Sequence, residues 1–365
     1  MRGNNTSTNR FIAFYLPQYY PIPENDKWYG KGFTEWTNVA KAKPLFRGHY
    51  EPHIPSELGF YDMRNPNTIK EQAKLASEYG IEGFCYWHYW FGNGKKLLNE
   101  PFEALVADKS IDISFCLSWA NGTWLANKWN GDEKRKVIVE QNYPGEEDIR
   151  AHFYELLPAF GDSRYIRVDD KPVFCIHEPD EIPNLAHFIS LWQQLARKEG
   201  LKGFYFVAKD FYCRNVKSYL KLGFDATYEM NTTRIHHEQN LFTKLRLMMQ
   251  RKILKMPSVF EYSKAIDYML QDEEKDEHII PVIAPNWDHS PRSGRDSIIL
   301  KNCEPRYFKR LVKRVISMIA SKPAERRIVF IQSWNEWGEG NHLEPDLKYQ
   351  RGYLEALAEA INEKR

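Results

Sequence analysis

Residues 329–345 read VFIQSWNEWGEGNHLEP, and the fold can be worked out from this stretch. An apolar run over residues 328–331 changes character at Ser333, as a buried strand does where it leaves a core. Two carboxylates three residues apart follow, Glu336 and Glu339, set among tryptophans and glycines. Carboxylate pairs break most glycosidic bonds, and aromatic faces suit sugar rings, so the stretch predicts a sugar-cleaving site. The alternative is a surface turn with solvated acids and tryptophans packed sideways into a core.

Seven other apolar runs precede this one. The eight predicted strands lie at residues 11–16, 83–87, 113–119, 172–177, 204–209, 224–229, 279–285 and 328–334. Amphipathic stretches predict helices at residues 67–79, 97–107, 146–157, 184–199, 213–222, 262–271, 306–321 and 350–363. Eightfold alternation of strand and helix predicts an α/β fold, a single (β/α)8 TIM barrel with long active-site loops.

A doubly wound open sheet is the structural alternative. It would normally carry a glycine-rich phosphate turn after its first strand, where this chain reads LPQYYPIP. We expect the barrel over residues 11–365, after a disordered tail at residues 1–10. A basic helical insertion is expected at about residues 231–260.

Active sites of such barrels lie at the C-terminal ends of the strands. Polar and aromatic residues gather at these positions, which predicts that they bind the substrate. They are Tyr19, Trp36, Trp87, His88, Trp90, Trp119, Asn121, Trp124, His177, Glu229, Asn286, Trp287, Asp288, Trp334 and Asn335. Structural roles are the alternative: His88 as a satisfied core histidine, Glu229 and Asp288 in ion pairs, and Glu35 as the cap of a lid segment.

Composition excludes several classes of protein. The formal net charge of +2 over 365 residues argues against nucleic acid as a partner. Five cysteines without CxxC spacing indicate a reduced compartment. Neither a signal peptide nor an apolar run long enough to span a bilayer is seen, so we expect a cytoplasmic protein, at most peripheral to the inner membrane.

No motif for a metal or a cofactor is present. HExxH, a phosphate-binding GxxxxGK[ST] loop and an Asp-x-Asp pair are all missing, so we expect neither a metal nor a cofactor. The segment 240–256, NLFTKLRLMMQRKILKM, carries five basic residues and no acid. It predicts a surface helix, which either packs on the protein or rests on anionic membrane or a lipid-linked substrate.

Four stretches together carry a resemblance to a known family. FYLPQYYPIPENDKWYGKGFTEWTNV, GFCYWHYWF, LSWANGTW and SWNEWGEGNHLEP resemble the WbsX-like proteins of bacterial surface-polysaccharide loci, which are related to glycoside hydrolase family 99, the endo-α-mannosidases. The resemblance covers residues 11 to about 357 and implies a (β/α)8 barrel acting on a glycan or lipid-linked oligosaccharide. The two glutamates that carry the hydrolase reaction fall on Glu336 and Glu339.

The resemblance also implies a mechanism. The first glutamate acts as a base on the sugar 2-OH, which attacks the anomeric carbon, and the second protonates the leaving oxygen. WbsX-like proteins are commonly described as glycosyltransferases of O-antigen or capsule assembly, so hydrolysis and transfer both stay open. A non-catalytic glycan-binding barrel is a third hypothesis, and it would predict the loss of one glutamate.

Overall fold

Parallel strands form the centre of the molecule. The computed structural model describes residues 9–125, 136–211, 214–230, 234–235, 241–253 and 255–363. The parallel strands are β1 (Arg10–Tyr15), β2 (Gly83–Trp90), β4 (Ser114–Trp119), β8 (Lys171–Ile176), β9 (Tyr205–Lys209), β10 (Ala226–Tyr228), β12 (Ile279–Ile280), β13 (Val282–Ile283) and β15 (Ile328–Ile331). They pair in the order β12-β10-β9-β8-β4-β2-β1-β15-β13, a nearly closed barrel that confirms the predicted fold class.

The barrel closes through the seventh predicted strand, which is two short strands. Pro281 separates β12 from β13, and proline has no N–H to donate to a ladder. β12 pairs with β10, whereas β13 pairs with β15. The Pro281 carbonyl still accepts a hydrogen bond of 3.0 Å from the Phe330 N–H. One interrupted run therefore connects the two ends of the sheet.

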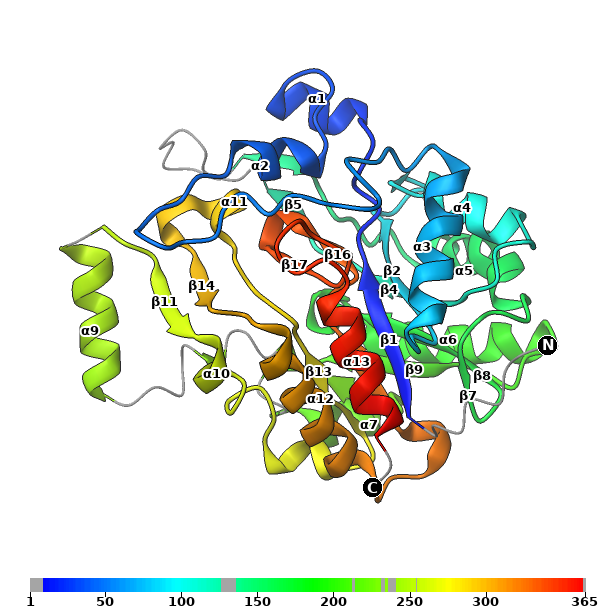
Figure 1. Cartoon of the computed structure of the whole chain (residues 1–365). Helices are drawn as coiled ribbons and strands as arrows, with labels where there is room; N and C mark the ends of the chain where they lie inside the picture. Colours follow the sequence, from blue (N-terminus) through cyan, green and yellow to red (C-terminus); the bar gives the residue numbers. More distant parts are fainter. Residues whose placement is uncertain are drawn as a thin grey trace.

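Helices cover the outside of the barrel (Figure 1). They are α3 (Pro66–Glu78), α4 (Glu100–Ala107), α5 (Glu146–Phe160), α6 (Leu185–Lys198), α7 (Val216–Leu222), α12 (Pro305–Ile319) and α13 (Gly352–Asn362). The helix predicted at residues 262–271 is reduced to α10 (Tyr262–Ala265). The chain turns after it and buries Ile266, Met269 and Leu270 without further helix, so that part of the prediction was wrong.

Additional elements lie around the barrel. Those between β1 and β8 are α1 (Pro23–Tyr29), α2 (Glu35–Lys41), β3 (Lys96–Leu97), β5 (Trp124–Leu125), β6 (Val137–Val139) and β7 (Arg167–Val168). Those after β8 are η1 (Pro179–Glu181), α9 (Leu241–Lys252), β11 (Ser258–Glu261), η3 (Asp272–Lys275), α11 (Ser290–Ser293), η4 (Gly294–Asp296), β14 (Ile298–Lys301), η5 (Ala324–Arg326), β16 (Asn335–Glu336), η6 (Trp337–Glu339) and β17 (Asn341–His342). The predicted tail lies largely outside the described residues, and the insertion expected at 231–260 lies partly outside them.

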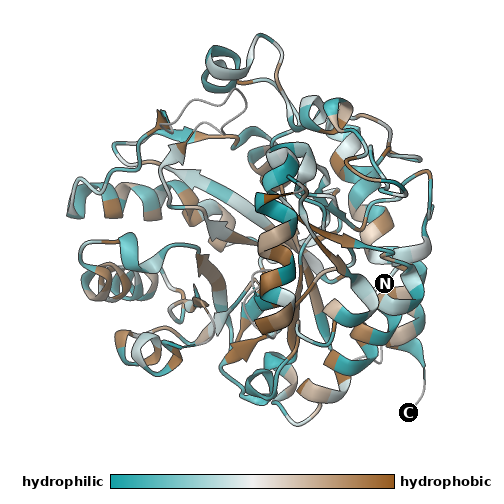
Figure 2. Cartoon of the chain, turned by 90° about the vertical axis from the view of Figure 1, so that its left-hand side faces the viewer, coloured by the Kyte–Doolittle hydropathy of each residue, from teal (hydrophilic) through white to brown (hydrophobic). Residues whose placement is uncertain are grey.

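The strands are buried on both faces, as parallel strands under a layer of helices must be. Figure 2 shows hydrophobic strands inside and hydrophilic residues on the outer helices. Within the barrel, the ring of Phe14 stacks on Trp87 at 4.9 Å and contacts the rings of Tyr228 and Phe330 at 5.5 and 5.0 Å. These rings fill the barrel and form the floor of its mouth. Across the described ranges, no helix has both the length and the apolar character that crossing a bilayer requires.

Candidate active site

The two glutamates stand on a tight turn after β15. The short strands β16 and β17 pair antiparallel around η6. The Ser333 hydroxyl accepts a hydrogen bond from the Glu336 N–H at 2.8 Å and donates one to the Asn341 carbonyl at 2.7 Å. Gly340 has a φ of +51°, and a Cβ there would lie 2.6 Å from the Cβ of Asp288. Only glycine therefore suits this corner of the turn.

Asn335 and Tyr19 attach this turn to the end of β1. The Asn335 side chain pairs with the backbone of Leu16, accepting from its N–H at 2.7 Å and donating to its carbonyl at 3.0 Å. The buried Tyr19 hydroxyl donates to the Asn335 carbonyl and accepts from the Trp337 N–H at 3.2 Å. Breaking such contacts would leave polar groups unpaired in the interior, so they hold the backbone of the turn in place.

Arg292, on α11, joins three carboxylates at the mouth. Its Nε donates to Glu35 Oε1 at 2.8 Å, its Nη2 to Glu336 Oε2 at 3.0 Å, and its Nη1 to Glu339 Oε1. The indole Nε1 of Trp87 donates to the other oxygen of Glu336 at 3.0 Å. One cation thus faces three acids, a charge imbalance that must be relieved by protonation or by a ligand.

Glu35 can join this cluster because residue 338 is a glycine and leaves room for its carboxylate. A Cβ on Gly338 would overlap the Glu35 carboxylate and lie 3.1 Å from Arg292 Nε. Asn38, one turn along α2, donates to Glu35 Oε1 at 2.9 Å. The glycine between the two candidate catalytic residues is therefore what lets the first loop of the barrel reach them.

The surroundings give the two glutamates different pKa values. Burial raises the pKa of Glu336 to about 8, with the charges of Glu339 and Glu35 adding to the effect against the opposing charge of Arg292. Burial also acts to raise the pKa of Glu339, but Arg292 and the hydrogen bond from His289 outweigh it and lower that pKa to about 2. At neutral pH one carboxyl group of the pair is therefore protonated and the other ionised, which acid–base catalysis requires.

A cavity of about 530 Å³ opens above the pair. Of the residues predicted from the sequence, those on its wall are Trp87, Trp124, His177, Trp287, Glu336 and Glu339. Sequence reasoning did not assign other wall residues to the substrate site, including Asn25, Tyr29, Phe33, Glu35, Asn38, Tyr89, Lys209 and Arg292. The wall therefore combines aromatic rings with few charged groups, as carbohydrate sites do.

Lys209 stands across the cavity from this turn. Its Nζ donates to His177 Nε2 at 2.8 Å and lies 3.4 Å from Glu178 Oε1. Burial and the lysine charge lower the pKa of His177 well below its usual range, so the imidazole is neutral and accepts this hydrogen bond. Lys209 is a cation whose charge is already partly paired.

Several residues predicted at strand ends point away from the cavity. Successive side chains of a strand face opposite sides, and on β2 Trp87 faces the mouth while His88 faces α5, hydrogen-bonded to His152 at 2.8 Å. Similar protein partners hold three further predicted residues. Trp90 donates to Asp148, Trp119 to the Trp90 carbonyl, and Asn121 to Tyr143 and the Glu178 carbonyl.

Other predicted residues lie beneath or behind the mouth. Glu229 forms an ion pair of 2.5 Å with Arg234, in line with the structural alternative weighed for it. Asn286 accepts from the His342 N–H at 2.9 Å. The rings of Tyr19, Trp36 and Trp334 are buried around the turn that carries Glu336 and Glu339, where Trp36 contacts Tyr19 at 4.6 Å. None of these residues is on the described wall of the cavity, as is also true of Asn335 and Asp288.

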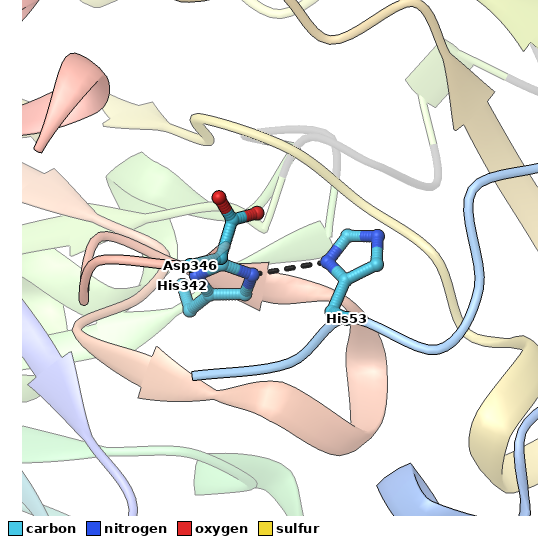
Figure 3. Close-up of side chains that lie close together, drawn as sticks. All are labelled: His53, His342 and Asp346. Carbon is cyan, nitrogen blue, oxygen red and sulfur yellow. Dashed lines mark hydrogen bonds between the residues drawn. The ribbon is translucent and has the colours of Figure 1, made fainter. Parts of the chain in front are cut away.

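Two buried clusters behind the turn have residue types that could bind a metal: His53, His342 and Asp346, and His49, Glu51 and Asp288. In the first cluster (Figure 3), His342 Nδ1 donates to the Glu344 carbonyl, which leaves its Nε2 to accept from His53 Nδ1 at 3.0 Å. Asp346 accepts hydrogen bonds from the backbone N–H groups of Lys348 and Tyr349. Hydrogen bonds between protein groups already account for this cluster.

The second cluster supports the turn that carries Glu336 and Glu339. His49 Nδ1 accepts from the Leu45 N–H, so its Nε2 donates to Asp288 at 2.5 Å. The Asp288 N–H in turn donates to the Glu339 carbonyl at 2.7 Å. Burial and the charge of Asp288 raise the pKa of Glu51 to about 9, so this acid is neutral beside its neighbour. We assign the cluster a positioning role.

The fold matches that of solved glycoside hydrolases. The GH99 endo-α-mannosidase from Bacteroides thetaiotaomicron superimposes with a TM-score of 0.59 at 15% identity, over 97% of this chain and 96% of that one. A structure described as a glycoside hydrolase-like protein gives a TM-score of 0.58 at 15% identity, over 98% and 94% of the two chains. The fold is therefore that of a GH99-type barrel.

The sequence identifies the family. Residues 11–357 match the family described as Glycosyltransferase WbsX, and the chain belongs to it. It is 36% identical over 354 residues to the uncharacterized protein WxcX of Xanthomonas campestris pv. campestris strain B100, covering 96% of this chain. The chain spans about half (49%) the length of that relative.

Proposed function

We propose that this protein cleaves glycosidic bonds of a bacterial surface polysaccharide or its precursor, with retention of anomeric configuration and with Glu336 and Glu339 as the catalytic pair. The observation that carries the proposal is the buried pair with divided pKa values, at the floor of an aromatic-lined cavity in a barrel mouth. The GH99 likeness supports the reaction class, and α-mannosides are accordingly the first substrates to test.

The proposed reaction runs in two steps. Glu336 takes the proton of a sugar 2-OH, and the 2-oxygen attacks the anomeric carbon while the glycosidic C–O bond breaks. Glu339 protonates the leaving oxygen. Glu339 then takes a proton from water, which attacks the anomeric carbon and opens the three-membered ring, and Glu336 returns its proton to the 2-oxygen. Two inversions give net retention.

These roles require a proton on Glu339, whereas burial and Arg292 together favour the proton on Glu336. Arg292 is the cause of this difference, because its Nη1 contact keeps Glu339 ionised against the effect of burial. We propose that the leaving sugar displaces Nη1 from Glu339, so that burial raises the pKa of that acid. Protonated Glu339 no longer repels Glu336, which keeps its Nη2 contact and becomes the base. One proton is thereby moved across the pair.

Sugar transfer is the second candidate, and the description of the family favours it. A nucleotide-sugar donor would need cations for its diphosphate. On the described wall of the cavity the lysine and arginine side chains are Lys209 and Arg292, and both contact carboxylates. This favours hydrolysis, and a non-catalytic glycan-binding barrel ranks last because both glutamates face the cavity.

We further propose a cytoplasmic location and a lipid-linked glycan as substrate. Cys85 and Cys116 stand opposite each other on β2 and β4 and are free thiols, which suits a reducing compartment. In the cytoplasm, this enzyme would encounter the glycan of a surface polysaccharide while it is still attached to its lipid carrier.

The test is product analysis with purified protein. α-Mannoside oligosaccharides incubated in water should yield shortened glycans, whose anomeric configuration is read by NMR before mutarotation and is expected to be retained. The Glu336→Gln protein is the control for adventitious hydrolysis. Incorporation of sugar from a nucleotide donor without any cleavage would overturn hydrolysis in favour of transfer.

A further inference from the structure

The helix α9 has an unusual surface for a helix of a globular protein. It stands on the flank of the molecule, outside the two-stranded sheet of β11 and β14 (Figure 1). Its sequence, LFTKLRLMMQRK, has four basic residues and no acid. The predicted surface helix is present here, within residues 240–256, although 240 and 254 lie outside the described residues.

The apolar side chains of α9 mostly face solvent. Phe242, Leu245, Met249 and Ile253 are 80%, 47%, 55% and 69% exposed. Their spacing of three or four residues places them on one side of a helix, and Leu247, which is buried, falls on the opposite side. Leu247 therefore docks the helix on the protein, and the four residues form an outward apolar stripe. The apolar stripe is therefore exposed to solvent.

Of the four basic residues, Arg246 and Lys252 fall beside this stripe, whereas Lys244 and Arg251 fall on the side of Leu247. Lys244, Arg246, Arg251 and Lys252 are all exposed, and Arg251 lies 3.9 Å from Asp296. Such a surface suits a partner that has negative charges on its surface and an apolar region directly beneath them.

A second cavity strengthens this charge pattern. About 370 Å³ lies between α9 and the β11–β14 sheet, and its wall includes Arg246, Lys264 and Lys301. Glu261 is the acid among the described lining residues, and it pairs with Lys301 at 2.6 Å. The cavity therefore has a net positive lining next to the apolar stripe, as a site for a phosphate group would.

We propose that α9 docks this protein on an anionic phospholipid surface, with the apolar stripe in the headgroup region and the flanking cations Arg246 and Lys252 on lipid phosphates. A helix with exposed apolar residues and only basic charges has the pattern of interfacial membrane helices. A protein partner of matching shape would need acidic groups around an apolar groove, whereas an anionic bilayer provides both features everywhere on its surface. The proposal does not rest on the catalytic one, because α9 contributes nothing to the described wall of the active-site cavity.

The experiment is vesicle co-sedimentation of the full chain. Vesicles of phosphatidylglycerol and phosphatidylcholine should retain at least about ten times more protein than pure phosphatidylcholine, and the difference should shrink with added salt. Reversing two charges (Arg246→Glu with Lys252→Glu) should remove that difference. Phe242→Ser with Ile253→Ser should lower retention several-fold. Glu336→Gln should sediment like the wild type, which separates this test from that of the catalytic proposal.

Matched variants serve as controls. Lys198→Glu with Lys217→Glu changes the net charge equally on the exposed surfaces of α6 and α7, and Leu347→Ser removes an apolar residue that is 57% exposed elsewhere. Both should bind as the wild type does. Equal retention on the two vesicle types, or unchanged retention after charge reversal in α9, would overturn the proposal. So would release by millimolar inorganic phosphate at constant ionic strength, or a dimer in sedimentation velocity that Phe242→Ser dissociates.

Discussion

The indole Nε1 of Trp87 donates a hydrogen bond of 3.0 Å to Glu336 Oε1, which ties the second strand of the barrel to the turn after the eighth. This donor stabilises the ionised carboxylate that a base requires. Its ring also stacks on Phe14, so the contact is held by packing from below.

Trp87→Phe should therefore lower kcat/KM for glycan cleavage while keeping the fold. A hydrogen bond to a charged group is worth about 1.5–3 kcal/mol, or roughly a 10- to 150-fold change. Phenylalanine keeps the stacking on Phe14, so the melting temperature should stay close to that of the wild type. Unchanged kcat/KM would show that this hydrogen bond does not contribute to catalysis.

The divided pKa values predict opposite stability effects for the two amide variants. The pKa of Glu336 rises from 4.5 to about 8 on folding, so the folded protein holds an extra proton between these values and loses stability as pH rises through them. Glu336→Gln should thus gain stability relative to the wild type, most of all above pH 8.

Glu339 has the reverse sign. Its pKa of about 2 contributes stability that is present above pH 4.5 and lost as pH falls toward 2. Glu339→Gln should be less stable than the wild type at neutral pH, and the difference should vanish in acid. Urea unfolding at pH 3, 5, 7 and 9 measures both. Effects of the same sign at pH 9 would contradict the division of charge described for the pair.

An activated substrate separates the proposed roles of the glutamates. A general acid typically contributes about 10²–10⁴-fold, but a leaving group such as dinitrophenolate needs no proton. Glu339→Gln should lose activity on the natural glycan but still release the aryl group of the activated glycoside in the first step, whereas Glu336→Gln should lose both. The opposite pattern would exchange the two roles.

Arg292→Met should move the pH profile of kcat/KM to higher pH on both limbs. Removing the guanidinium takes away a positive charge that lowers the pKa of both glutamates. Arg292→Lys keeps one charge and should give a smaller shift. If both variants only lower the height of the profile, Arg292 has a structural role and does not tune the pair.

Gly338→Ala should abolish activity by a steric effect alone. The added methyl group would occupy the place of the Glu35 carboxylate, which must then leave Arg292. Gly122→Ala is the matched control at the same mouth, because its Cβ would come no closer than 3.9 Å to Glu178. An active Gly338→Ala enzyme would mean that Glu35 is dispensable.

Much of the barrel could be predicted because hydrophobic periodicity reports burial directly. All eight apolar runs contain a strand of the barrel. Pro281 can be seen within the seventh run of the sequence. Whether it divides that strand depends on which strands pair with it, and hydrophobic periodicity does not reveal strand pairing. Residues 262–271 have a helix-like pattern that a compact turn satisfies equally well.

The site was predicted less completely. Trp87, Trp287 and Glu336 line the cavity, and each stands at or just after the end of a predicted strand, which the sequence marks. His88 and Trp119 follow strand ends too but face the helices, and which of two successive residues faces inward depends on register. Arg292 lies in the four-residue helix α11, within the sequence SPRSG, and nothing local indicates that three distant acids converge on it.

Both catalytic candidates stand on one four-residue turn, whereas the walls above them come from separate loops. The distance between the two acids is thus set by the backbone of this turn and by the contacts of Tyr19, Asp288 and Arg292 with it. Loops after β4 and β9, which supply Trp124 and Phe211 to the wall, can then change in length or composition without touching the groups that hold the pair. In such a scaffold the residues that carry out the reaction and the residues that select the sugar can evolve separately. Grafting those loops between relatives should therefore change which glycan is bound while the reaction stays the same.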